Sequence, residues 1–280
     1  MGAGRWRYLL VVANEAEIRR WNDERWTAAW PERERLTAAV SASLLGEVDA
    51  RPGQRVLEIG CGGGLVTMEL AAAVAPGGSV VGVDVSAALL ALAGTRIAQG
   101  AVPAITLARL DMQTAAVDGG PFDVAVSQFG VMFFDQPETA FRNVRRQMRP
   151  GGDLVFAAWQ GVDRNPWHTG RALSGLVPAP PPPGPGQRAT GPFTMGDVAE
   201  TTQLLAAAGF VDIASRPYET TVDAPASAVV DPALFDFMGI PPERMAEAGE
   251  MMDRHLRQFA LGPGVYRFPL AFHIYRAQAR

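Results

Sequence analysis

The segment VLEIGCGGG at residues 56–64 constrains the fold of this chain more than any other feature. Its first four residues form an apolar run typical of a strand, and the helix-like pattern of Leu65–Ala75 follows the glycines. Glycine has no side chain and tolerates positive φ, so a tight turn with open backbone is expected between strand and helix. Asp84 closes the next apolar run, VVGVD, where an acid is placed to accept two hydrogen bonds from a ribose diol. These two features predict a cofactor that contains a nucleoside.

The glycine spacing helps to decide which nucleoside cofactor is expected. The dinucleotide fingerprint G-x-G-x-x-G needs a third glycine for close packing of helix on strand, and this chain has Leu65 there. Glu58 lies two residues before the first glycine, where a carboxylate would repel a pyrophosphate and would suit an ammonium group. S-adenosylmethionine (SAM) has an ammonium, a sulfonium and a ribose but no phosphate. SAM is therefore favoured over NAD.

Five segments, in order and at matching spacing, resemble the class I SAM-dependent methyltransferases. The family's first motif is an acid, any residue and G-x-G-x-G, and the resemblance is closest to the ubiquinone/menaquinone C-methylase-like group of small-molecule methyltransferases. The matching segments are VLEIGCGGG, Asp84, Leu110-Asp111-Met112, FDVAVSQFGVMFF (residues 122–134) and MRPGGDLVFAAW (residues 148–159). Together they cover about half of the chain directly.

The resemblance implies a role for each matching position. Glu58 would hold the methionine ammonium, directly or through water, Asp84 the ribose and Asp111 the adenine amino group, while an N-terminal helix covers the cofactor. The residues expected at the SAM site are Trp21, Trp26, Glu58, Gly60, Cys61, Gly62, Gly64, Asp84, Val85, Leu89, Asp111, Met112, Ser127 and Phe129. The product of the reaction would be S-adenosylhomocysteine (SAH).

Several of these positions also have a structural interpretation. Glu58 would then be a solvated charge at a strand end, Asp84 a cap for the helix that begins near Ser86, and Asp111 a cap in a loop. For Cys61, a small side chain packed under the loop is the favoured interpretation. No metal site is expected, because one cysteine and three histidines supply no recognisable ligand cluster.

Methyl transfer needs alignment more than proton transfer, and the resemblance therefore leaves the catalytic residues open. Positioning of the reactants lowers a barrier by up to about 7–11 kcal/mol in well-oriented systems, and a base is needed only when the nucleophile must first lose a proton. His168, just after the fifth expected strand, is the candidate base or substrate-orienting residue, and Gln128 is the candidate polar contact. Phe129 is expected nearest the transferred methyl group.

Composition excludes several other function classes. The net charge is −4 and no Lys/Arg run exceeds two residues, so nucleic acid is not expected as a partner. All 25 basic residues are arginine, which excludes a Schiff-base lysine and a P-loop lysine. Cys61 is the single cysteine, so no disulfide framework forms within the chain and a cytoplasmic location is expected. No stretch approaches the ~20 apolar residues of a membrane span.

Alternating strand and helix signals predict an α/β fold with a doubly wound, Rossmann-like parallel sheet. The resemblance implies seven strands, with an antiparallel last strand inserted between the fifth and sixth. The expected parts are N-terminal helices covering the cofactor (1–50), the SAM-binding core (51–160), and a substrate cap with a proline-rich loop and the closing strands (161–280). Outside the core, the expected elements are helices 15–30, 32–48, 194–208 and 241–259, an extended segment 177–186, and strands 211–218 and 267–275.

The sequence therefore predicts a SAM-dependent methyltransferase that acts on a small, apolar or aromatic molecule. Two alternatives remain: a SAM-binding regulatory or partner subunit that does not methylate, and a NAD(P)-dependent oxidoreductase. The acceptor, the methylated atom and a possible homodimer stay open.

Overall fold

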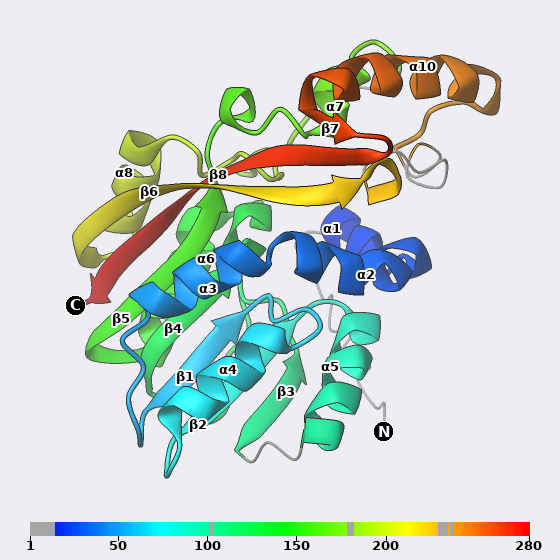
Figure 1. Cartoon of the computed structure of the whole chain (residues 1–280). Helices are drawn as coiled ribbons and strands as arrows, with labels where there is room; N and C mark the ends of the chain where they lie inside the picture. Colours follow the sequence, from blue (N-terminus) through cyan, green and yellow to red (C-terminus); the bar gives the residue numbers. More distant parts are fainter. Residues whose placement is uncertain (1–14, 101–103, 178–181, 229–234, 236–237) are drawn as a thin grey trace, which may run out of the picture.

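The computed structural model describes residues 15–100, 104–177, 182–228, 235 and 238–280, and shows a single mixed sheet surrounded by helices (Figure 1). The strand order is β3-β2-β1-β4-β5-β8-β6, and a short β7 also pairs with β8. The strands are β1 (Arg55–Ile59), β2 (Ser79–Asp84), β3 (Ile105–Arg109), β4 (Phe122–Gln128), β5 (Met148–Trp159), β6 (Phe210–Pro225), β7 (Ala260–Gly262) and β8 (Val265–Ala279). The expected doubly wound α/β fold is confirmed, with eight strands rather than seven because of β7.

The central strands are parallel and buried on both faces. In β1, the four residues after Arg55 are buried, which fits the continuous apolar run typical of a strand with helices on both sides. The α-helices are α1 (Glu15–Trp21), α2 (Glu24–Leu36), α3 (Ala38–Glu47), α4 (Leu65–Val74), α5 (Ala87–Gly100), α6 (Pro137–Gln147), α7 (Thr169–Ala172), α8 (Val198–Ala207) and α10 (Met245–Leu256). None of the described helices is long and apolar enough to cross a membrane.

The order of the strands creates a point where a ligand can bind. β1 pairs with β2 on one side and with β4 on the other, both in parallel. The chain therefore winds outward in opposite directions from β1. Ligands in open α/β sheets bind at the carboxyl ends of the strands at such a switch point.

β8 completes the sheet and extends beyond it toward α7, α10 and β7. It lies antiparallel between β5 and β6, as the resemblance implied. The long β6–β8 pair extends beyond the other strands, and α7, α10 and β7 gather at its far end (Figure 1). A cap cluster of buried apolar residues forms there, separate from the main core: Leu173, Leu176, Ala224, Phe235, Ile240, Ala248, Met252, Leu256 and Phe268.

The N-terminal helices differ from the expected pattern. The single helix expected over residues 15–30 is wrong, because α1 ends at Trp21 and α2 begins at Glu24. Asp23 caps α2, with its side chain accepting a hydrogen bond from the backbone N–H of Arg25. Pro31 consequently lies inside α2 and not in the first turn of a new helix.

Other boundaries outside the core were also misplaced. The helix expected from Thr194 begins at Val198, because Asp197 and not Thr194 caps it. The last two strands are longer than expected, since they pair with each other along almost their whole length. α10 is shorter than the expected helix 241–259, because 3-10 turns flank it on both sides. Residues 178–181 of the proline-rich segment lie outside the described residues.

Candidate functional site

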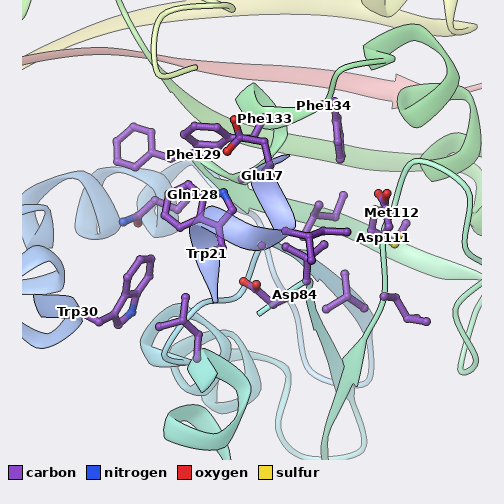
Figure 2. Close-up of a pocket in the computed structure, with 18 residues that line it drawn as sticks. Glu17, Trp21, Trp30, Asp84, Asp111, Met112, Gln128, Phe129, Phe133 and Phe134 are labelled. Carbon is purple, nitrogen blue, oxygen red and sulfur yellow. The ribbon is translucent and has the colours of Figure 1, made fainter. Parts of the chain in front are cut away.

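A cleft opens at the carboxyl ends of β1, β2 and β4, at the switch point of the sheet (Figure 2). Residues from α1, α2 and the loops after the strands contribute to its wall, which is mostly apolar. The cleft is lined by Glu17, Ile18, Trp21, Trp30, Ile59, Gly60, Val83, Asp84, Val85, Leu89, Leu110, Asp111, Met112, Gln128, Phe129, Gly130, Phe133 and Phe134. It therefore contains most of the positions that the sequence singled out for a cofactor.

Asp84 joins the end of β2 to the glycine loop. One carboxylate oxygen accepts a hydrogen bond from the backbone N–H of Gly62 at 2.9 Å, and the other accepts from Ser86 at 2.8 Å. Burial raises the pKa of Asp84, and these backbone donors oppose that rise. Each oxygen retains acceptor capacity beyond its backbone bond, so the fixed carboxylate can still receive two hydroxyl groups.

The glycines of the loop allow α2 to lie directly on it. Gly62 has φ +52°, and a Cβ placed there would stand 2.4 Å from the ring of Trp30. A Cβ on Gly60, with φ +71°, would stand 2.9 Å from the Cα of Gly130. A side chain at either position would therefore displace the neighbouring element, and the loop presents bare backbone to the cleft.

Glu58 lies under the loop and not on the wall of the cleft. Its side chain is buried and accepts a short hydrogen bond from the hydroxyl of Thr67. Burial raises the pKa of Glu58 to about 8, with the nearby charge of Asp84 adding to the rise and Thr67 opposing it. A cationic group beside this carboxylate would offset the cost of its burial.

The wall of the cleft also includes Val85, Leu89, Leu110, Asp111 and Met112. Leu89 and Met112 are buried and apolar, which suits the faces of a flat ring. The carboxylate of Asp111 accepts a hydrogen bond from the backbone N–H of Gln113, and burial raises the pKa of Asp111. Asp111 thus has the cap interaction of the structural interpretation and also lines the cleft.

Three expected positions lie behind the loop. Cys61 is buried, and a Cβ on Gly82 of β2 would stand 3.2 Å from its Sγ, so its side chain packs against that strand. Ser127 donates a hydrogen bond to the carbonyl of Ile59 at 2.7 Å and so ties β4 to β1. Gly64 is the N-cap of α4, and a Cβ placed on it would stand 2.9 Å from the Cβ of Ala93 on α5. None of the three lines the cleft.

The N-terminal tryptophans surround the cleft from the side of α1 and α2. Trp21 lines it and contacts Phe133 edge-on, with ring centroids 4.9 Å apart. Trp30 also lines it, whereas Trp26 lies behind Trp21 and packs under the guanidinium of Arg33. The break between the two helices places Trp30, and not Trp26, against the glycine loop.

The two residues considered for catalysis lie in different places. Gln128, at the end of β4, lines the cleft, and its Oε1 is buried without a hydrogen-bond partner among the described residues. His168 does not line the cleft and packs edge-on against Phe193 at 4.9 Å. Burial lowers the pKa of His168. Phe129 is in the wall and stacks on Trp159, with ring centroids 4.1 Å apart.

Sequence reasoning missed Glu17. The residue is 3% exposed and lines the cleft from α1. A charged residue in a short helix that precedes the glycine motif by about 40 residues gives no local signal of a site, because only the packing of α1 across the sheet brings it there. No group of three or more His, Cys, Asp or Glu side chains among the described residues could hold a metal ion.

The chain matches a known family model over part of its length. Residues 56–152, from β1 into β5, match the model described as a methyltransferase domain. This segment includes the glycine loop, Asp84, Asp111 and Gln128.

Individual relatives agree with this match. The nocamycin O-methyltransferase of Saccharothrix syringae is 26% identical over 269 residues, which cover 83% of this chain and 89% of that protein. The ubiquinone/menaquinone biosynthesis C-methyltransferase of Ectopseudomonas mendocina is 32% identical over 106 residues, covering 38% of this chain and 41% of that protein. Two other curated relatives are matched over only about a third of their own length.

A solved structure supports the fold beyond the matched domain. A methyltransferase-like protein from Bacillus halodurans superposes with a TM-score of 0.59 at 15% identity, covering 85% of this chain and 98% of that one. At this identity the likeness concerns the fold alone.

Proposed function

We propose that this chain, whose residues 56–152 match a methyltransferase domain, transfers the SAM methyl group to a small, apolar or aromatic molecule. The observation that carries the proposal is Asp84, held against the glycine loop at the switch point of the sheet. The relatives support a small-molecule acceptor, since one is named a nocamycin O-methyltransferase and the other a methyltransferase of ubiquinone/menaquinone biosynthesis. The single cysteine supports a cytoplasmic location.

The cleft fits the parts of SAM in the proposed order. Asp84 would accept the ribose hydroxyls, Asp111 the adenine amino group, and Leu89 and Met112 would cover the adenine ring. Glu58, from beneath the loop, would balance the methionine ammonium through water or through movement of the loop. Bound SAM supplies a methyl group already activated by its sulfonium.

The chain's own part in the reaction is to align the acceptor and exclude water. Trp21 and Trp30 would close the cofactor from the N-terminal side, and Phe129, Phe133 and Gln128 would line the space for the acceptor. The stacked pair of Phe129 and Trp159 supports an aromatic or unsaturated acceptor. His168 would orient the acceptor from behind the wall of the cleft, next to Trp167.

Calorimetric titration with SAH, with NAD as a parallel control, tests the cofactor. We expect micromolar SAH binding and no NAD binding, because Glu58 and Leu65 disfavour a pyrophosphate. A preference for NAD would favour an oxidoreductase and overturn the proposal. A non-methylating SAM-binding subunit would bind SAH equally well, so transfer of radiolabel from SAM to a panel of small acceptors separates it from an enzyme.

A further inference from the structure

Glu17 is a buried carboxylate in the cleft that the proposed cofactor contacts do not use. It lies on α1 and is 3% exposed. Glu17, Phe129 and Phe133 all line the cleft, and in Figure 2 the carboxylate of Glu17 is drawn away from that of Asp84. Glu17 therefore lies where the acceptor, and not the ribose, is expected.

Two partners hold this carboxylate in place and leave part of it free. The hydroxyl of Thr190 donates to Oε1 at 2.7 Å, and Arg20 approaches Oε1 at 3.1 Å and Oε2 at 3.3 Å. Arg20 balances the charge, and Thr190 ties α1 to the segment before α8. An ionised carboxylate has about four lone-pair sites, so Oε2 retains a site for one more donor.

Gln128 offers a second free acceptor in the same wall. Its Nε2 donates to Thr37 at 3.5 Å, whereas its Oε1 is buried and has no partner among the described residues. An unpaired buried amide oxygen costs free energy until a ligand supplies a donor. Glu17, Gln128 and Phe129 all line the cleft.

The charges of the whole cleft favour one class of acceptor. Its described wall contains three carboxylates, from Glu17, Asp84 and Asp111, and no arginine or histidine. The indole N–H of Trp30 is already bonded to Glu34. An anionic acceptor would therefore meet repulsion and no free cationic partner, whereas a neutral acceptor with a hydroxyl group could donate its one proton to one of the free oxygens.

We propose that Glu17 binds the hydroxyl group of a neutral phenolic acceptor, so that this chain is an O-methyltransferase for phenols. The inference rests on the proposed methyltransferase function. During transfer the hydroxyl proton passes to the Glu17 carboxylate as the phenolic oxygen forms its bond to the methyl carbon. The electron pair of the broken carbon–sulfur bond stays on sulfur, and the proton then leaves to solvent.

Binding of 4-nitrophenol to the SAH complex tests this role without turnover. The neutral and ionised forms of this probe absorb differently, so a pH titration of the bound probe reports which form the site prefers. Because ionised Glu17 accepts a hydrogen bond and repels a phenolate, we expect binding to raise the pKa of the probe. Glu17→Gln should remove most of that rise and weaken probe binding about tenfold or more, the usual loss for a charge-assisted hydrogen bond.

The controls separate this inference from the function on which it rests. Glu17→Gln should bind SAH as the wild type does, and Glu24→Gln, at an exposed position of α2, should change neither measurement. Should Glu17→Gln fail to fold, Glu17→Asp keeps the charge and should retain part of the pKa rise. Failure of the wild type to bind SAH would overturn the proposed function itself.

Other outcomes overturn the role of Glu17 alone. One such outcome is that the SAH complex binds benzoate or 4-nitrophenolate more tightly than neutral 4-nitrophenol. Another is that it binds benzylamine more tightly than either form of the probe. An equal rise of the probe's pKa in Glu17→Gln and in the wild type would also contradict the role of Glu17. So would an SAH complex that binds no 4-nitrophenol at millimolar concentration.

Discussion

At the scale of single residues, Asp84 offers the most direct test of the cofactor site. Asp84→Ala removes the acceptor of the Gly62 and Ser86 backbone N–H groups and of the expected ribose hydroxyls. We expect SAH affinity to fall by about 1.5–3 kcal/mol, or about 10- to 150-fold. Calorimetry with a circular-dichroism check of folding measures this, and Asp253→Ala, exposed on α10, is the control. An unchanged affinity would remove Asp84 from the site.

Glu58 should make the stability of the ligand-free chain depend on pH. Its pKa is about 8 in the folded state against 4.5 in the unfolded state, so the folded state binds more protons between these values. The free energy of unfolding is then unaffected by Glu58 below about pH 4.5 and falls as the pH rises toward 8, by at most about 5 kcal/mol in total. Above that pH it no longer changes through Glu58. Urea unfolding of Glu58→Gln across this range should show a smaller fall.

The matched control for that measurement is Glu69→Gln, because Glu69 is exposed on α4, the helix that carries Thr67. Its stability should fall with pH as in the wild type. A Glu58→Gln curve parallel to that of the wild type would show that Glu58 titrates normally in the folded chain.

At the scale of elements, an ion pair between α2 and α5 adds to the packing of Trp30 on the glycine loop. Arg96 of α5 bonds Glu34 of α2 at 2.8 Å and donates to the carbonyl of Gly63 at 2.8 Å. Arg96→Ala should free α2, with faster hydrogen exchange in that helix and about fivefold faster SAH release, for a loss of about 1 kcal/mol. Arg35→Ala breaks the exposed pair of Arg35 with Glu32 on the same helix and should change neither rate. Equal rates in all three proteins would contradict a fastening role.

The same helices show where sequence reasoning reached its limit. The core elements from β1 to β5 were predictable, since each apolar run and each glycine or proline turn has a local physical cause. Asp23 caps α2 at the break, and the break decides that Trp30 rather than Trp26 meets the glycine loop. Placement of Glu17 depends on packing between segments far apart in sequence, which no local pattern encodes.

At the scale of the whole molecule, the cofactor site and the cap cluster rest on separate clusters of buried apolar residues. The central position of β8 was implied by family resemblance alone, because a strand's neighbours are set by tertiary pairing and not by its own residues. Its far half, around Phe268, belongs to the cap cluster, whereas its near half, around Tyr275, belongs to the main core. Damage to the two clusters should therefore affect the cofactor site differently.

Matched cavities in the two clusters should separate stability from binding. Met252 on α10 and Leu70 on α4 are both fully buried, in the cap cluster and the main core respectively. Truncation of either to alanine should cost about 2–5 kcal/mol of stability, measured by urea unfolding. Only Leu70→Ala should also weaken SAH binding, because α4 begins directly after the glycine loop while no residue of the cap cluster lines the cleft. Equal weakening by Met252→Ala would show that cap and cofactor site respond as one cooperative unit.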